Sequence, residues 1–171
     1  IGYSLAKLLE SNFEGARVKI IEKNKQRAEE IANELSSSIV INGDGLDEDI
    51  LKEANLDDSE TVLALTNDDE NNIMACVLAE KSGQKKRTIA IVNKTNYNLL
   101  QSSLNIDDLV DPRMTTVSRI MEHVHKGTIG SVYSLLDGEY EFLEVKISEK
   151  SSLINKTIKD SNIPDHIRIG I

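Results

Sequence analysis

A single carboxylate at the end of a short apolar run is the feature of this sequence that most directly indicates chemistry. The run is Val18-Lys-Ile-Ile-Glu22, and Gly2 lies twenty positions before its last residue. In a βαβ unit that binds a dinucleotide, the second strand ends in a carboxylate that accepts hydrogen bonds from the adenosine ribose hydroxyls. We therefore predict that Glu22 contacts a ribose. Gly2 would be the last glycine of a G-x-G-x-x-G pattern, and the first strand and its two phosphate-facing glycines would precede it.

Polar residues also follow the next predicted strand, which covers 38–42. Gly43 could let the backbone pass close to an adenine ring, and Asp44 could accept a hydrogen bond from the exocyclic amine of that ring. Glu22 favours NAD over NADP because a carboxylate repels a 2′-phosphate. Lys23 beside it weakens this preference, and we include Lys23 among the candidate binding residues.

A third set of polar residues, Thr66-Asn67-Asp68, follows the predicted strand 61–65. The hydroxyl and amide of the first two could contact ribose or phosphate. Taken alone, each polar residue has an ordinary explanation: Asn67 and Asp68 can cap a helix, and a Gly-Asp pair can form a turn. Three such strand ends meet at one edge of a parallel sheet, and their order along the chain favours a nucleotide site there.

The sequence offers no comparable pattern for catalysis. His123 and His125 are two positions apart on a predicted helix, so they face different sides and cannot share a metal ion. His166 lies in the short second domain. The run Asp68-Asp69-Glu70 is explained by the helix dipole, which favours acids in a first turn. We therefore expect a binding protein that is not an enzyme and has no metal site.

Short apolar runs alternate with amphipathic segments along most of the chain. The predicted strands are 18–22, 38–42, 61–65, 87–92 and 107–110, and the predicted helices are 1–10, 25–35, 47–54, 68–81 and 95–104. Helix 68–81 carries an apolar stripe of Ile73, Met74, Val77 and Leu78 and ends at Gly83. This alternation predicts an α/β fold with a doubly wound parallel sheet, Rossmann-like, with its first strand missing.

The pattern changes after Pro112. We predict a longer helix over 113–126 closed by Gly127, two strands over 131–136 and 139–147 joined by the turn Asp137-Gly138, a loop with a short helix over 150–162, and a strand over 167–171. We place the domain boundary near Gly127. Residues 1–127 would form the nucleotide-binding domain, and 128–171 the start of a small α+β domain.

Composition limits the class of protein. The net charge of −9 argues against a nucleic-acid partner, since phosphate binding needs clustered Lys and Arg. A hydrophobic content of 39% with 29% charged residues is typical of a globular protein, and no apolar run is long enough to span a bilayer. The single cysteine, Cys76, is expected to be buried, and it favours a reducing compartment, for which the cytoplasm is the default.

Several ordered motifs resemble one known family. They are Gly2, Glu22, Gly43-Asp44, the phrase Asp49-Ile-Leu-Lys-Glu-Ala-Asn-Leu56, the run from Thr61 through Asn67 to Ile73, and Ala90-Ile-Val-Asn93. Together they resemble the RCK (regulator of potassium conductance) domain, and within it the TrkA-type regulatory subunits of Trk potassium-uptake systems. The resemblance covers residues 1 to about 126, and residues 131–171 resemble the start of the family's C-terminal domain.

The resemblance implies a cytoplasmic ring of such domains, peripheral at the inner face of the membrane and attached to a membrane-embedded potassium transporter subunit. It implies that NAD, NADH, ATP or ADP biases the conformation of that ring. It places Gly2 in the glycine loop, Glu22 at the ribose, Asp44 on the adenine side, and Thr66, Asn67 and Asp68 at the rim.

The resemblance also implies that the helix over 113–126, with its stripe of Val117, Ile120, Met121 and Val124, packs domains into dimers. Burial of this stripe against its own domain is the alternative.

One position departs from the family. Many members have an arginine that can contact phosphates where this chain has Ile91, and we therefore rank NAD or NADH above ATP or ADP. Two other functions stay open: a fragment of an NAD(P)-dependent oxidoreductase, and a self-associating scaffold without a ligand.

Overall fold

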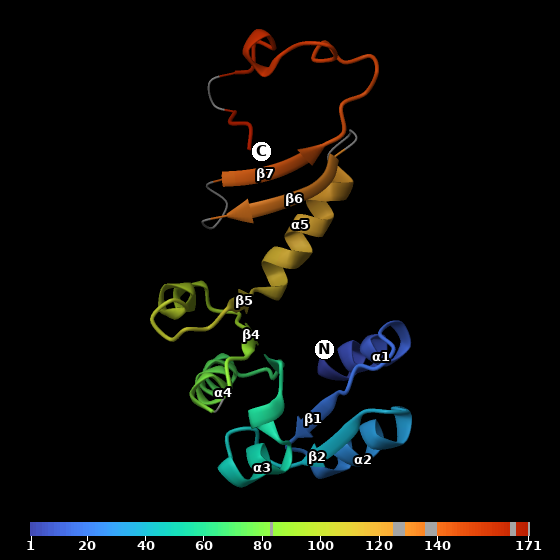
Figure 1. The fold of residues 1–171 in the computed structure, drawn as a ribbon, viewed down its shortest axis with the longest axis vertical. Coiled ribbons are helices and arrows are strands. Elements are labelled where there is room, and N and C mark those ends of the chain that lie inside the picture. The colour runs from blue at the N-terminus through green and yellow to red at the C-terminus, as the bar shows by residue number, and fades with distance from the viewer. Residues whose placement is uncertain (83, 125–128, 136–139, 165–166, 171) are drawn as a thin grey trace. The chain divides into compact units, whose positions relative to one another are not determined.

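The structure is a computed structural model that describes residues 1–82, 84–124, 129–135, 140–164 and 167–170. The chain divides into two compact units, Ile1–Pro112 and Arg113–Ile171, which Figure 1 shows in blue to yellow and in orange to red. The predicted boundary near Gly127 lies outside the described residues and stays a prediction.

The first unit alternates helices and strands in the predicted order. Its elements are α1 (Gly2–Asn12), β1 (Lys19–Glu22), α2 (Lys25–Glu34), β2 (Ile39–Asn42), α3 (Glu48–Glu53), β3 (Thr61–Ala64), α4 (Asp69–Lys81), β4 (Arg87–Ile91) and β5 (Asp108–Val110). β1 pairs with β2, and β3, β4 and β5 form a three-stranded sheet in that order. Every one of these pairings is parallel, which confirms the predicted α/β class.

Side-chain caps explain where three of the helices begin. Asn24 accepts a hydrogen bond from the Arg27 N–H at the start of α2, and Asp68 accepts one from the Asn71 N–H at the start of α4. Asp47 caps α3 in the same way. Asp and Asn satisfy the free N–H groups of a first turn and are preferred there. Each of these helices therefore begins within a short loop of a strand end that carries candidate site residues.

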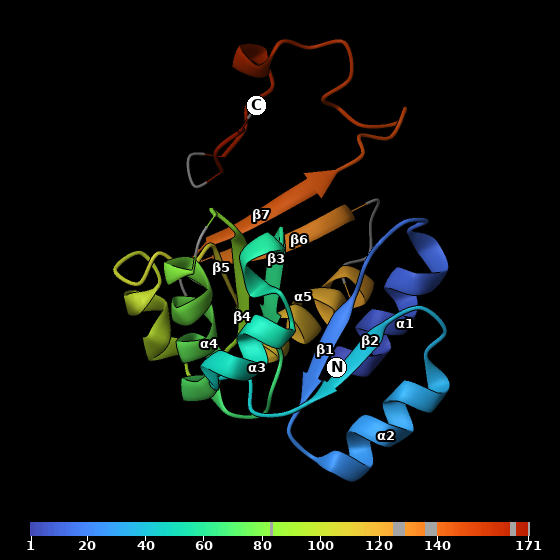
Figure 2. The ribbon, with the colours of Figure 1, turned by 60° about the horizontal axis from the view of Figure 1, so that its bottom comes forward.

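Each sheet has its own core. α1 and α2 pack on β1 and β2 through Ala6, Ile31 and Leu35. α4 packs on the other sheet, and that core consists of Ala64, Ile73, Cys76, Ala90, Val92 and Ile106. Figure 2 shows α2 beside β2 and α4 beside β4. The predicted burial of Cys76 is confirmed, because the residue is 0% exposed.

Two details of the prediction for the first unit are wrong. Met74 was assigned to the inward stripe of α4 but is 49% exposed, and the buried residues of this helix are Asp69, Asn72, Ile73, Cys76 and Ala79. The segment 95–104 was expected to be an α-helix, but a 3-10 helix covers only Thr95–Leu100. Asn and Thr have low helix propensity, which favours the shorter element. Asn105 adopts a left-handed conformation with φ 54° just beyond this segment.

The second unit contains α5 (Pro112–Val124), whose first residue is in unit 1, and an antiparallel pair formed by β6 (Ile129–Leu135) and β7 (Tyr140–Val145). This pairing confirms the predicted hairpin, although its turn Asp137-Gly138, like Gly83, lies outside the described residues. The strand predicted over 167–171 is wrong for 167–170, which form no strand. A strand needs a neighbour for its N–H and C=O groups.

The apolar stripe of α5 can be followed in part. Val117 is 47% exposed and Ile120 is 55% exposed. Among the described residues, no helix combines the length and the apolar character needed to cross a membrane.

Candidate functional site

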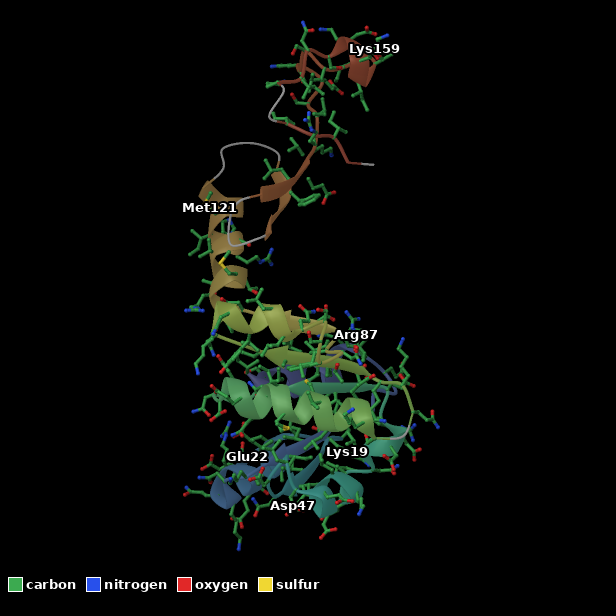
Figure 3. The ribbon with its side chains drawn as sticks, turned by 90° about the vertical axis from the view of Figure 1, so that its left-hand side faces the viewer. Lys19, Glu22, Asp47, Arg87, Met121 and Lys159 are labelled. Carbon is green, nitrogen blue, oxygen red and sulfur yellow. The ribbon has the colours of Figure 1, made fainter. Side chains whose placement is uncertain are left out.

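The ends of β1 and β2 are tied together by backbone and amide hydrogen bonds. Glu22 lies opposite Asn42 in the parallel register. The Asn42 Nδ2 group donates to the carbonyl oxygens of Glu22 at 2.9 Å and Lys23 at 3.2 Å, and the Gly43 N–H donates to the Glu22 carbonyl at 3.1 Å. Glu22, Lys23, Gly43 and Asp44 are therefore brought together, as the sequence predicts. Figure 3 shows Glu22 on one side of this unit and Lys19 and Arg87, which begin β1 and β4, on the other.

The Glu22 carboxylate is half-buried and partly occupied. Its Oε1 atom accepts a hydrogen bond from the Asn24 N–H at 2.8 Å. This contact fixes the orientation of the carboxylate. A carboxylate has about four acceptor positions, so it retains capacity for ribose hydroxyls.

Lys23 and Asp44 form an ion pair. The Lys23 Nζ atom lies 2.7 Å from Asp44 Oδ2, and Asp44 Oδ1 accepts a hydrogen bond from the Leu46 N–H at 3.0 Å. The hydrogen bond from Lys23 lowers the pKa of Asp44, and the same contact raises the pKa of Lys23. Both Asp44 oxygens already have donors within the protein. An adenine amine would therefore share this carboxylate with Lys23.

Gly43 has a packing role in addition to the one predicted. An ideal Cβ at Gly43 would lie 2.5 Å from the Ile50 Cδ1 atom of α3. The space left by the missing side chain is thus filled by Ile50. At Gly2, by contrast, a Cβ would meet no described atom within 4 Å, so its close contact with a strand stays a prediction.

The residues after β3 are committed mainly to the start of α4. The N–H and Oγ1 groups of Thr66 both donate to Asn72 Oδ1, at 2.9 and 2.7 Å, and Thr66 Oγ1 accepts from the Asp68 N–H at 3.1 Å. Asp68 caps α4 through a 2.8 Å bond to the Asn71 N–H, and Asn67 is exposed. Of the three predicted residues, Asn67 is the one that presents its side chain to solvent without serving the helix cap.

Asn72 joins the ends of β3 and β4 and was missed by the sequence analysis. Its Nδ2 group donates to the carbonyl oxygens of Thr66 at 3.0 Å and Ile91 at 2.9 Å, and the residue is 0% exposed. With the two bonds that its Oδ1 atom accepts, the carboxamide is fully satisfied. The helical spacing 69, 72, 73, 76 could have placed it on the same face as Ile73 and Cys76, but not beside its partners.

Asp69 holds the loop after β4 and was missed in the same way. Its carboxylate accepts hydrogen bonds from the N–H groups of Asn93 at 2.9 Å and Lys94 at 3.0 Å, and from Asn93 Nδ2 at 2.9 Å. Burial raises the pKa of Asp69, but the bonds from Asn93 and Lys94 outweigh burial, and the net shift is downward. The carboxylate is therefore ionised and paired with N–H groups.

Lys94 itself is bound to the first turn of α4. Its Nζ atom lies 2.6 Å from Glu70 Oε1, which also accepts a hydrogen bond from the Tyr97 hydroxyl at 2.5 Å. The bond from Lys94, followed by that from Tyr97, lowers the pKa of Glu70 to about 2. The side chains of Lys94 and Glu70 are 55% and 57% exposed.

We call the ends of β1, β2, β3 and β4 with their following residues the carboxyl edge.

The opposite edge carries a hollow of about 530 Å³, lined by Lys85, Lys86, Arg87, Asp107 and Asp108. It lies at the amino ends of β4 and β5, away from every predicted binding residue. In the part of the chain that the structure describes, no group of three or more His, Cys, Asp or Glu side chains could hold a metal ion.

Comparison with known proteins places this geometry in a family. The model of the TrkA-N domain matches residues 1–112. The Trk system potassium uptake protein TrkA of Azorhizobium caulinodans is 43% identical over 170 residues, which cover 99% of this chain and 37% of that protein. The protein of the same name from Vibrio alginolyticus is 38% identical over 173 residues, with the same coverage of each chain. The chain thus spans little more than a third of the length of these relatives.

Solved structures confirm the fold. The TrkA-N domain of the inner membrane protein ybaL from Escherichia coli has a TM-score of 0.60 at 16% identity and covers 70% of this chain and 84% of that one. A structure described as the GsuK channel bound to NAD has a TM-score of 0.60 at 20% identity and covers 78% of this chain and 23% of that one. The predicted Rossmann-like fold and the predicted TrkA resemblance are both confirmed, and the chain belongs to the TrkA-N domain family.

Proposed function

We propose that this chain binds a nucleotide at its carboxyl edge as part of a regulatory subunit of a potassium uptake transporter. The observation that carries the proposal is the convergence of Glu22, Lys23 and Asp44 at the ends of two paired parallel strands. Membership of the TrkA-N family and the names of the relatives support it.

NAD or NADH is the proposed ligand, and ATP or ADP is the alternative. The half-buried Glu22 carboxylate can accept hydrogen bonds from ribose hydroxyls. Ile91 is 7% exposed and apolar, so it offers a phosphate no charge at the end of β4. The folds similar to this one include GsuK bound to NAD and GsuK bound to ADP, so both ligands belong in the test.

Regulation would operate through differential binding. A ligand that prefers one conformation of the assembly shifts the population towards it, by as much as its affinities for the two conformations differ. The assembly would be a dimer or higher ring in which α5 packs against its counterpart through Val117 and Ile120. It would bind the membrane-embedded transporter subunit from the cytoplasmic side.

A thermal-shift series on the intact protein with NAD, NADH, ATP, ADP and AMP tests the binding step. A ligand at 100 times its dissociation constant stabilises the folded state by about 2.7 kcal/mol. We expect NADH or NAD to raise the melting temperature most. A selective shift with ATP or ADP would overturn the choice of ligand, and no shift with any nucleotide would overturn the proposal.

Glu22→Ala tests the placement of the ribose. The variant loses charge-assisted hydrogen bonds, and we expect the binding free energy of NADH to weaken by about 1.5 kcal/mol. This value is the lower end for such bonds, because one carboxylate oxygen already accepts a hydrogen bond from the Asn24 N–H. Glu60→Ala is the matched control, because Glu60 directly precedes β3 at the opposite edge. Calorimetry that gave both variants the affinity of the wild type would show that the ribose lies elsewhere.

The oxidoreductase alternative makes a different prediction. It requires hydride transfer between NAD(H) and a small carbonyl compound, which is measured by absorbance of the reduced nicotinamide. We expect NADH to bind without turnover. Steady turnover by the intact protein that is lost in Glu22→Ala would overturn the regulatory proposal in favour of the oxidoreductase alternative.

A further inference from the structure

The last residue of β2 and the residue after it form an Asn-Gly pair, Asn42-Gly43, and the sequence contains no second one. In such a pair the backbone nitrogen of the glycine can attack the Cγ atom of the asparagine, because glycine has no side chain to obstruct the approach. Asparagine is among the thermolabile residues of proteins. Asn42 is exposed, so water has access to its side chain. The chemistry of this pair is therefore that of spontaneous deamidation.

Deamidation takes place in two steps, and water is the only co-reactant. In the first step a bond forms between the Gly43 nitrogen and Asn42 Cγ, and the bond between Cγ and Nδ2 breaks. The amide proton of Gly43 leaves with the Nδ2 group as ammonia, and a succinimide ring remains. In the second step water opens the ring at either of its carbonyl carbons. The product is aspartate or isoaspartate at position 42, and nothing is oxidised or reduced.

In the folded protein one acceptor holds both nitrogen atoms that react. The Glu22 carbonyl oxygen accepts hydrogen bonds from the Gly43 N–H at 3.1 Å and from Asn42 Nδ2 at 2.9 Å, and the Lys23 carbonyl oxygen accepts from the same Nδ2 at 3.2 Å. The attack requires the Gly43 nitrogen to lose its proton and the carboxamide to turn towards that nitrogen, and these changes break the hydrogen bonds. The parallel pairing that places Glu22 opposite Asn42 therefore opposes the reaction.

The product of the reaction would not restore these hydrogen bonds. A carboxylate at position 42 has no N–H group, so the carbonyl oxygens of Glu22 and Lys23 would lose the donor that Nδ2 provides. Isoaspartate would in addition lengthen the backbone by one carbon atom at the last pair of the β1–β2 register. The ends of the two strands would then pair less stably than before.

We propose that Asn42 is a deamidation site that the paired ends of β1 and β2 protect and that reacts when these strand ends separate. Local opening of this kind takes place in folded proteins without global unfolding. Because the product cannot restore the hydrogen bonds from Nδ2, each reaction permanently weakens the pairing that had prevented it. The inference does not depend on the proposed function, because it involves only groups of the protein itself.

Mass spectrometry tests the protection on the intact protein, incubated at mildly alkaline pH with and without guanidinium chloride and then digested with trypsin. The tryptic peptide 28–52 contains Asn42 and also Asn33, which precedes Glu34 and is the internal reference. In denaturant we expect Asn42 to lose its amide group faster than Asn33. In the native protein we expect the rate at Asn42 to be lower by about tenfold or more, because three hydrogen bonds must break first. Isomerisation at Asp44, which also precedes a glycine, leaves the mass unchanged.

Two results of this experiment would overturn the inference. If Asn42 reacted no faster than Asn33 in denaturant, the Asn-Gly pair would not be a deamidation site in this chain. If Asn42 reacted as fast in the native protein as in denaturant, the strand ends would give it no protection.

A matched pair of variants separates opening of the strand ends from global unfolding. Ile41→Ala truncates a buried side chain of β2 beside Asn42, and Ile73→Ala truncates an equally buried one in the core of the other sheet. We expect the first variant to raise the rate at Asn42 in the native protein and the second to leave it unchanged. An equal rise in both would show that global unfolding exposes the site, and would refute a role for the strand ends.

Asn42→Asp represents one product of the reaction and tests its effect on the pairing. We expect its melting temperature to fall by about 5 °C, because two hydrogen bonds are lost. Asn67→Asp is the matched control, since it adds the same charge at an exposed asparagine that follows β3 at the carboxyl edge. We expect it to change the melting temperature by less than about 2 °C. Equal melting temperatures for the two variants would refute the weakening of the pairing.

Discussion

Gly43 provides the sharpest test of the packing beneath the candidate site. A Cβ atom at this position would lie 2.5 Å from Ile50 Cδ1, 2.6 Å from Cγ1 and 3.0 Å from Cγ2. Two of these three atoms are attached directly to the branched Cβ of Ile50, so no small rotation of the end of the side chain removes the clash. Gly43→Ala must therefore displace α3 or the turn that carries Asp44.

The expected effect can be worked out from these distances. Adding a methyl group to a well-packed site costs about 1–3 kcal/mol. Because Ile50 is half-buried and can move partly towards solvent, we expect Gly43→Ala to lower the free energy of unfolding by about 2 kcal/mol. The midpoint of urea unfolding should fall by about 1 M. The chain has no tryptophan, so far-UV circular dichroism is the suitable signal.

A double-mutant cycle with Ile50→Ala decides whether the clash is the cause. Ile50→Ala removes the three clashing atoms and leaves room for the new methyl group, so Gly43→Ala should cost almost nothing in that background. The coupling energy between the two substitutions should be about 2 kcal/mol, far above the roughly 0.5 kcal/mol seen for independent sites. Strictly additive effects would refute the reasoning and would point to backbone conformation at Gly43.

Three further predictions concern other parts of unit 1. The hydrogen bond from the Ser37 N–H, with those from its neighbours, lowers the pKa of Glu10 from 4.5 to about 2. This carboxylate therefore stabilises the fold above pH 4.5 and loses that effect as the pH falls through 2. Glu10→Gln should flatten the pH dependence of the melting temperature between these two pH values. Burial raises the pKa of the Cys76 thiol to about 11, so we expect a disulfide reagent at pH 8 to label it only in denaturant, and rapid labelling of the native protein would contradict the packing. Lys86 is 2% exposed and donates hydrogen bonds to three backbone carbonyl groups. Lys86→Met should lower the free energy of unfolding, measured in urea, by about 2 kcal/mol, whereas the exposed Lys52→Met should lower it by less than about 0.5 kcal/mol.

The sequence predicted the elements of unit 1 well because the local signals there agree. Apolar strands of β-branched residues alternate with helices that begin at Asn24, Asp47 and Asp68, and each of these residues caps its helix in the structure. Parallel pairing of β1 with β2 then brings Glu22 beside Asn42 without any further information. The polar residues at the ends of β1 and β2 therefore lie together at the carboxyl edge.

The roles of Asp69 and Asn72 could not be predicted because they depend on contacts with distant loops. Asp69 was explained by the helix dipole, and Asn72 was not among the residues assigned to the apolar stripe of this helix. In the structure both are buried, since they bind residues 66, 91, 93 and 94. The assignment of Met74 to the core was wrong because the stripe 73, 74, 77, 78 also has helical spacing, whereas the face that is buried includes the polar residues Asp69 and Asn72. A polar residue on a buried face shows its role only when its partners are known.

The hydrogen bonds at both ends of α4 have a consequence for local opening. Helices usually fray from their ends, so terminal amides exchange with solvent sooner than central ones. At the first turn of α4, Asp69 and Asn72 hold the adjoining loops. Just beyond its last residue, the Lys86 ammonium group binds the carbonyl oxygens of the C-cap Ser82 at 2.6 Å and of Gln84 at 2.9 Å. Because both ends of α4 are held by hydrogen bonds, unwinding of either end of the helix would break the contacts at that end together. The amides of α4 should then become accessible only when the whole β3–β4–β5 layer opens.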